Sequence, residues 1–175
     1  MIVETQKLNT GTQEGYNYSE QAEAALGELV FGQGCEVTTG IDSRYDLLTP
    51  NNKKIEIKFT NAKTIFIETS YADGTPSGLA VSEADYYLIV QKGFYQNQDI
   101  GKIKLISTDA LRNVRYSCQL TSYPPSYNSP GSCGFRLGQE LGQKDGWLGS
   151  IRFNNGYDLS GFTVKRPLLK QVRNF

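Results

Sequence analysis

Two short runs of apolar residues flank Pro50-Asn51-Asn52, and their spacing limits how this part of the chain can fold. In Ile55-Glu56-Ile57-Lys58, apolar and charged residues alternate, which is typical of a strand with one buried face. Asp46 lies ten positions before Glu56 among apolar neighbours, and Pro-Asn-Asn is typical of a turn. The sequence therefore predicts a β-hairpin in which Asp46 lies beside Glu56 and Lys58.

The segments around this hairpin predict an α/β fold. A helix is expected to begin after Asn17, with Glu20 as its capping-box partner, and to end near Phe31 before Gly32. Ser107 is expected to cap a second helix that runs to about Arg115. Strands are expected at 35–39, around Asp46, and at 54–60, 64–68, 86–90 and 102–106, with a short helical turn at 81–85. This order predicts a central mixed sheet flanked by helices.

The composition changes near residue 116. Residues 1–115 are expected to form the core, whereas residues 116–175 are rich in Gly and Tyr and predict a basic, loop-rich extension for substrate recognition or oligomerisation. Small strands are expected at 146–148 and 151–153, and a terminal helix is expected to start around Pro167.

The residue types that the sequence lacks limit the kinds of catalysis that the chain can perform. The chain contains no histidine, which excludes Ser-His-Asp and Cys-His catalysis, and its three cysteines form no CxxC pair. No apolar run approaches the roughly 20 residues of a membrane span, and the first 13 residues lack the apolar stretch of a secretory signal. We therefore expect a cytoplasmic protein whose site uses carboxylates, lysine, hydroxyls or a metal held by oxygen.

The net charge of zero conceals two halves of opposite sign. Residues 1–91 carry six Lys and Arg against thirteen Asp and Glu, whereas residues 92–175 carry twelve against five. An acidic half can hold a metal ion and a basic half can hold phosphate, although ordinary solvated charge has the same pattern.

Two acids and a lysine at the rim of a sheet can hold a divalent cation and assist phosphodiester cleavage. The alternative is a solvated polar face on a surface hairpin.

Asp46 followed by Glu56-x-Lys58 resembles the motif of the PD-(D/E)XK nuclease superfamily. Glu23 resembles the helix glutamate of many members, and its spacing to Leu26, Leu29 and Gly34 is similar to that of Holliday-junction resolvases. The later segment 68–87 is similar to small phage-type members, which would place the protein in the host cytoplasm. The residue before Asp46 is Tyr45 instead of the proline in the motif's name. The resemblance covers about residues 17–115 and implies a restriction-endonuclease-like core.

The resemblance implies specific roles for these residues. Glu23, Asp46, Glu56 and Lys58 would be catalytic, and Mg²⁺, or Mn²⁺ in its place, would be held by Asp46, Glu56, the Ile57 carbonyl and Glu23. Glu20 is an alternative to Glu23 as the helix acid. The predicted DNA contacts are Lys63, Ser77, Arg112, Arg115, Arg136, Lys144, Arg152, Lys165 and Arg166.

Together these residues imply a metal-dependent endodeoxyribonuclease that cuts branched or duplex DNA. Holliday-junction resolution is favoured slightly by the helix spacing, and homing or restriction-type cleavage is an alternative. Because cutting two strands usually needs two active sites, a homodimer or higher homo-oligomer is expected. A non-catalytic nucleic-acid-binding module on the same fold is the alternative from a different class.

Overall fold

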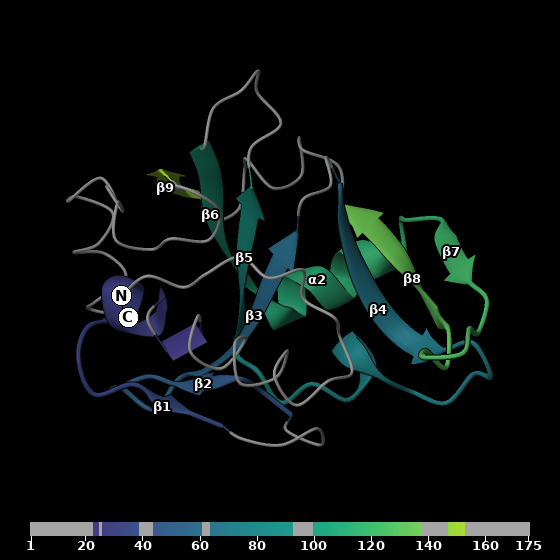
Figure 1. Ribbon diagram of the computed structural model, residues 1–175, viewed down its shortest axis with the longest axis horizontal. Coiled ribbons are helices and arrows are strands. Elements are labelled where there is room, and N and C mark those ends of the chain that lie inside the picture. Colours follow the sequence, from purple (N-terminus) through teal and green to yellow (C-terminus); the bar gives the residue numbers. More distant parts are fainter. Residues whose placement is uncertain are drawn as a thin grey trace.

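The computed structural model describes residues 23–24, 26–38, 44–60, 64–92, 100–137 and 147–152 (Figure 1). The expected caps at Asn17 and Glu20 and the expected helix from Pro167 lie outside these residues, as do Lys63, Lys144, Lys165 and Arg166. Among the helices that are described, none is long and apolar enough to cross a membrane.

The predicted hairpin is confirmed. Strand β2 (Leu47–Leu48) pairs antiparallel with β3 (Lys54–Thr60), with Leu47 opposite Ile55, and β1 (Glu36–Val37) pairs with the other edge of β2. The turn between β2 and β3 includes Asn52 in the left-handed region at φ 59°. Asparagine tolerates this conformation better than most residues, which explains how the Pro-Asn-Asn sequence closes the hairpin.

In the described residues, six strands form the mixed sheet at the centre of the fold, in the order β1-β2-β3-β5-β6-β9. Strands β3 and β5 (Tyr86–Lys92) are parallel, whereas β6 (Ile100–Ser107) runs antiparallel to both β5 and β9 (Trp147–Arg152). The expected α/β class with a mixed central sheet is therefore confirmed. Residues 146–148 and 151–153 were expected to form two strands, but a single strand, β9, covers most of this region.

A helix packs on one face of this sheet. Residues 23–24 and 26–31 are helical, and Leu26, Val30 and Phe31 contact the side chains of Ile55 and Ile57 in one buried cluster. The helix ends at Phe31, as predicted, where Gly32 has φ 92° and the left-handed conformation that glycine adopts readily. The alternating isoleucines of β3 therefore face the helix, and the charged residues between them face the other way.

A second sheet lies on the other side, and its described strands have the order β4-β8-β7. The expectation that residues 64–68 extend the central sheet was wrong, because β4 (Ile65–Tyr71) pairs with β8 (Ser132–Leu137), and β8 pairs with β7 (Leu120–Tyr123). Its inner residues, including Ile65, Ile67 and Phe135, form a second buried cluster with side chains of β5 and β6. Residues beyond 115 thus contribute strands to both sheets.

Helix α2 (Thr108–Arg115) follows β6 directly and lies between β3 and β8 in Figure 1. Its Leu111 belongs to the second buried cluster. Ser107 caps it as predicted, because the Ser107 side chain accepts a hydrogen bond from the Ala110 N–H. The helical turn expected at 81–85 was wrong. The 3-10 turn η1 (Gly78–Ala80) comes earlier, and the N–H groups of Glu83 and Asp85 bond to the carbonyls of Arg44 and Lys54 instead of closing a helical turn.

Candidate active site

Asp46 lies where the backbone pairing of β2 with β3 ends. One oxygen of its carboxylate, Oδ2, accepts a hydrogen bond from the backbone N–H of Ile57 at 2.7 Å, and the Asp46 N–H donates to the Ile55 carbonyl at 2.9 Å. The half-buried Asp46 side chain therefore takes the position that a backbone carbonyl would hold in a longer strand. This bond fixes the carboxylate at the edge of β3, beside Glu56 and Lys58.

Glu56 is half-buried and lies close enough to Asp46 for the Asp46 charge to change its pKa. Burial raises the pKa of Glu56 to about 7, with a further increase from the Asp46 carboxylate and a decrease from Lys58. Burial also raises the pKa of Asp46, whereas the Ile57 N–H and the Lys58 ammonium lower it. The structure therefore brings Asp46, Glu56 and Lys58 together in one electrostatically coupled group, as the sequence predicted.

The charged face of β3 continues across the sheet. Lys58 is in register with Ile89 of β5, and Ile89 is in register with Lys104 of β6. Because paired residues on neighbouring strands point to the same face, the two lysines share a row with one isoleucine between them. Lys104 is only 2 % exposed. Lys104 could not be assigned to this row from the sequence, because its alignment with Lys58 depends on pairing between distant strands.

The oxygen atoms at the Asp46 edge fit a hard divalent cation. In a strand, the N–H and C=O of one residue point to the same edge, so the Ile57 carbonyl points toward Asp46, as its N–H does. The Asp46 carboxylate raises the pKa of Glu56, and two carboxylates this close are a suitable pair of ligands for Mg²⁺ or Mn²⁺. Within the described part of the chain, no group of three or more acidic, Cys or His side chains could hold a metal ion. A site here therefore depends on Asp46, Glu56 and backbone oxygen.

Glu23 is buried, with 8 % of its surface exposed. It is three residues before Leu26 and seven before Val30, so it shares the helix face that packs on the central sheet. That helix covers the sheet face carrying Ile55 and Ile57, opposite the face of Glu56. The proposed role of Glu23 as a third acid stays a prediction, and Glu20 lies outside the described residues.

Tyr87 is a neighbour of the acidic pair that the sequence analysis did not include in the site. It is fully buried and in register with Glu56. Burial raises its pKa to about 12; the nearby Ser82 hydroxyl lowers it, and the Glu56 carboxylate raises it. Ser82 lies close but does not meet hydrogen-bond geometry, and the Tyr87 hydroxyl has no hydrogen-bond partner among the described residues. The only sequence signal was a tyrosine within an apolar run, where its hydroxyl needs a partner.

The described residues among the predicted DNA contacts lie in different environments. Ser77 is 4 % exposed, and its hydroxyl donates to Glu68 at 2.6 Å. Arg112 donates to the Ser82 carbonyl at 2.9 Å, whereas Arg136 is exposed on β8. Arg115 is half-buried at the end of α2, and Arg152 lies in β9. Contact of these residues with DNA stays a prediction.

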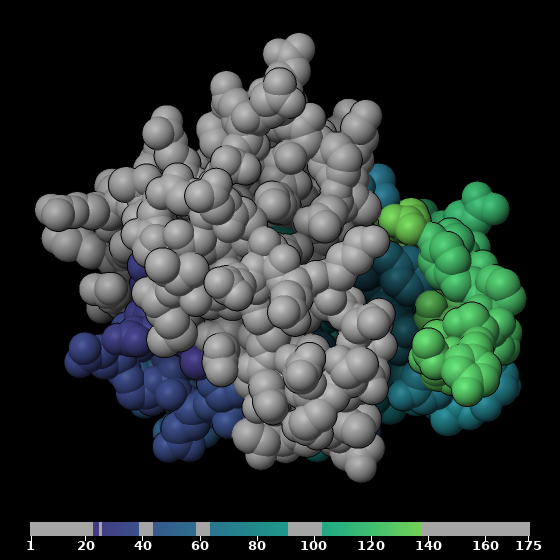
Figure 2. Space-filling view, in the orientation of Figure 1, coloured from purple at the N-terminus to yellow at the C-terminus, as the bar shows by residue number. Residues whose placement is uncertain are grey.

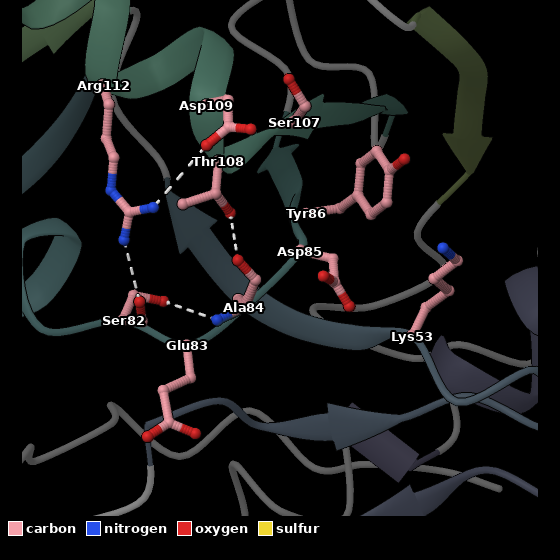
Figure 3. A pocket seen from close by; sticks show the side chains of 10 residues that line it. All are labelled: Lys53, Ser82, Glu83, Ala84, Asp85, Tyr86, Ser107, Thr108, Asp109 and Arg112. Atoms are coloured by element: carbon pink, nitrogen blue, oxygen red, sulfur yellow. Dashed lines mark hydrogen bonds and ion pairs between the residues drawn. The ribbon is translucent and has the colours of Figure 1, made fainter.

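A cavity of about 320 Å³ lies at the beginning of β5 and α2 (Figure 3). Its polar groups bond to one another: Thr108 Oγ1 donates to the Ala84 carbonyl at 2.6 Å, and Ser82 Oγ accepts from the Ala84 N–H at 3.2 Å. Arg112 points toward Ser82 and Asp109 and completes this connection between α2 and β5 (Figure 3). None of Glu23, Asp46, Glu56 and Lys58 lines this cavity. The candidate active site is therefore a separate place on β3.

No protein-family model matches the chain, and no curated protein shows significant similarity to it.

Proposed function

We propose that this chain is a metal-dependent endonuclease that hydrolyses phosphodiester bonds in DNA. The observation that supports it most strongly is the coupling of Asp46, Glu56 and Lys58. Asp46 is held on β3 by the Ile57 N–H, it raises the pKa of Glu56, and the Lys58 charge opposes both shifts. A solvated surface hairpin would leave these side chains exposed and independent of one another, whereas Asp46, Glu56 and Lys58 are all half-buried.

Each residue has a distinct role in the proposed reaction. Asp46, Glu56 and the Ile57 carbonyl would hold Mg²⁺, which would polarise the scissile phosphate and lower the pKa of water when bound. Lys58 would orient the attacking water or stabilise the negative charge that develops on the phosphate oxygens as an ammonium, or accept the proton of the water as a neutral amine. Glu23 would act on this site through water, because no three acids of the described residues form a metal-binding group.

The resemblance of Asp46, Glu56 and Lys58 to the PD-(D/E)XK motif extends the proposal to the fold. We propose a restriction-endonuclease-like core acting in the cytoplasm, with Holliday-junction resolution as the leading activity and homing or restriction-type cleavage as the alternative. Strand β3 pairs antiparallel with β2 in the hairpin and parallel with β5 on its other edge, and this arrangement is compatible with such a core. A homodimer or higher homo-oligomer would supply one site for each strand.

The experiment is a cleavage assay with purified protein. Supercoiled plasmid, linear duplex, single strands and a synthetic four-way junction are incubated with Mg²⁺, Mn²⁺ or Ca²⁺. We expect nicking or strand cleavage with Mg²⁺ and Mn²⁺. Lys58→Ala and Glu56→Gln should each reduce the rate by at least a hundredfold, because each removes a group that acts on the reacting atoms.

Two matched variants control for changes of surface charge. Lys54 is on the same face of β3 as Lys58 but forms an exposed ion pair with Glu83, with Nζ and Oε2 3.0 Å apart. Lys54→Ala and Glu83→Gln should therefore cleave like the wild-type protein. Equal loss of activity in Lys54→Ala and Lys58→Ala would contradict the assignment of Lys58.

The second candidate is a non-catalytic nucleic-acid-binding module. It is favoured by the basic half of the chain, which carries twelve Lys and Arg against five Asp and Glu in residues 92–175. If the wild-type protein binds DNA but cuts none of the four substrates with either Mg²⁺ or Mn²⁺, this candidate replaces the nuclease.

A further inference from the structure

The outer face of the second sheet carries an ordered group of aromatic and cationic side chains. Alternation along β4 places Ile65 and Ile67 in the core and Phe66 on the outer face. Phe66 is in register with Arg136 of β8, which lies between the buried residues Phe135 and Leu137. We call Thr64, Phe66, Tyr123 and Arg136 the aromatic platform.

Arg136 organises this platform. Its guanidinium carbon lies 5.6 Å from the ring centroid of Phe66 and 5.7 Å from that of Tyr123. Its Nη1 donates to Thr64 Oγ1 at 3.1 Å, and its Nη2 donates to the Tyr123 hydroxyl. The two rings meet edge to face, with centroids 5.2 Å apart and planes at 84°. These contacts pre-organise the rings and the cation, which lowers the entropy cost of binding a ligand.

The platform lies at the surface, where two of its members are exposed and two, Thr64 and Phe66, are half-buried. Arg136 is exposed and Tyr123 is 38 % exposed, and strands β7 and β8 lie at the surface on the right of Figure 2. Tyr71, at the end of β4, is also 38 % exposed. Ser132 of β8 is in register with Tyr71 on one side and with Tyr123 on the other. A small residue thus lies between two exposed tyrosines. The fold itself does not need aromatic rings at these positions, because the inner face of the sheet supplies the core.

The chemistry of the platform favours a nucleic acid over a protein partner. Aromatic rings and an arginine plane stack on nucleobases, and a guanidinium with five N–H donors can also bond to phosphate. None of the four platform residues is acidic. The acid on the outer side of β4, Glu68, accepts a hydrogen bond from the Ser77 hydroxyl at 2.6 Å. The platform also includes residues of the basic half of the chain.

We propose that the aromatic platform binds unpaired bases of single-stranded DNA. This inference rests on the proposed nuclease function and narrows its substrate to DNA with single-stranded or branched segments. Bases inside a duplex are stacked on one another, so their faces cannot reach Phe66 and Tyr123, whereas unpaired bases can. Strand β4 begins five residues after β3 ends, so the platform is connected closely to the strand that carries Glu56 and Lys58.

The test measures binding separately from cleavage. Fluorescence anisotropy with a labelled 20-nucleotide oligo-dT and a duplex of equal length is performed in EDTA, where no metal-dependent cleavage occurs. For Tyr123→Leu combined with Arg136→Ala, we expect a loss of affinity for oligo-dT of about tenfold or more, and a loss for duplex of under about threefold. Tyr116→Leu is the matched control. Tyr116 is 86 % exposed at the end of α2, outside the platform, and its variant should bind like the wild type.

Photo-crosslinking provides a direct second measurement. An oligonucleotide containing 5-iododeoxyuridine should crosslink to Tyr123, which mass spectrometry would locate within the tryptic peptide 116–136. A crosslink at Tyr116 or Tyr127 with none at Tyr123 would contradict the proposal. This measurement remains informative even if the double variant folds poorly, because it uses the wild-type protein.

Other results would overturn the inference. Unchanged affinity for oligo-dT, or an equal loss for single strand and duplex, would show that the platform does not select unpaired bases. If light scattering showed that the double variant loses a dimer while its affinity for oligo-dT is unchanged, the platform would be a contact between copies of this chain. Cleavage is scored separately on plasmid DNA, single strands and the four-way junction. A protein that binds oligo-dT through Tyr123 but cuts nothing would therefore overturn the nuclease proposal alone.

Discussion

The Asp46 carboxylate accepts a hydrogen bond from the backbone N–H of Ile57 at 2.7 Å, on the strand that carries Glu56 and Lys58. The same side chain therefore contributes to the fold and to the candidate site. Its carboxylate continues the hairpin pairing where the backbone of β2 leaves β3, and its charge raises the pKa of Glu56. Substitutions that keep the hydrogen-bond acceptor but remove the charge can separate these two contributions.

We predict that Asp46→Asn and Asp46→Ala differ in stability but both lose metal binding. Asn keeps an oxygen that can accept from Ile57, whereas Ala leaves a partly buried N–H without its partner, which should lower the free energy of unfolding by about 1–2 kcal/mol. Both variants remove a carboxylate ligand and should weaken Mn²⁺ binding at least tenfold. Urea unfolding and titration calorimetry measure the two effects. Wild-type Mn²⁺ affinity in Asp46→Asn would exclude Asp46 as a ligand.

The metal-free protein should lose stability as the pH rises from about 4.5 to about 7. The pKa of Glu56 in the folded chain, about 7, is above its ordinary value of 4.5, so the folded state holds the proton more tightly than the unfolded state. The stabilisation is present below the unfolded pKa and is lost as the pH passes the folded pKa. From the size of this shift, the loss should be at most about 3–4 kcal/mol. The raised pKa of Asp46 acts in the same direction.

Urea unfolding in EDTA at several pH values measures this dependence. Glu56→Gln should remove most of it, because glutamine does not titrate. Saturating Mg²⁺ should also reduce it, because a bound cation favours the ionised carboxylates. An equal pH dependence in the wild type and in Glu56→Gln would show that another group is responsible.

Tyr87→Phe should leave stability unchanged or increase the free energy of unfolding by up to about 1 kcal/mol. The Tyr87 hydroxyl is buried without a hydrogen-bond partner among the described residues, and removing an unsatisfied polar group avoids its desolvation cost. Thermal and urea unfolding measure the change, with the exposed Tyr116→Phe as the control. A loss of more than about 1 kcal/mol in Tyr87→Phe alone would mean that the hydroxyl has a partner.

The parts of the site that are close in sequence could be predicted. The hairpin joining Asp46 to Glu56 needs only local alternation and a turn, and both are visible in the sequence. The same is true of the Ser107 cap, because capping involves residues three positions apart. The proximity of Asp46, Glu56 and Lys58 follows directly from the hairpin register.

The parts that depend on distant pairing could not be predicted. Strand β4 has the same alternation whether it joins the central sheet or a second one, and its partner β8 begins more than 60 residues later. Tyr87 lies beside Glu56 only because β5 runs parallel to β3, which local periodicity does not indicate. The aromatic platform could not be predicted either, because Phe66 and Arg136 come together only through the pairing of β4 with β8.

Gly78→Ala should be much more destabilising than Gly74→Ala, although both glycines have positive φ angles. A Cβ at Gly78, where φ is 52°, would lie 2.4 Å from the backbone oxygen of Glu68, whereas a Cβ at Gly74, where φ is 89°, would meet nothing within 4 Å. Gly74→Ala should therefore show only the cost of a left-handed conformation, about 1–2 kcal/mol. Gly78→Ala adds a clash with β4 and should cost about 3 kcal/mol or more.

Urea unfolding of the two variants tests the contact between η1 and β4, because both variants have the strain of a positive φ and Gly74, at φ 89°, is farther from the ordinary left-handed range. The Glu68–Ser77 hydrogen bond lies beside this contact, so Ser77→Ala should lower the free energy of unfolding of the wild-type protein by about 1 kcal/mol. In the Gly78→Ala background the effect should be smaller, because the clash has already separated the two segments. Equal losses in Gly74→Ala and Gly78→Ala would mean that η1 and β4 are farther apart than described. Additive effects of Ser77→Ala and Gly78→Ala would mean that the two contacts are independent.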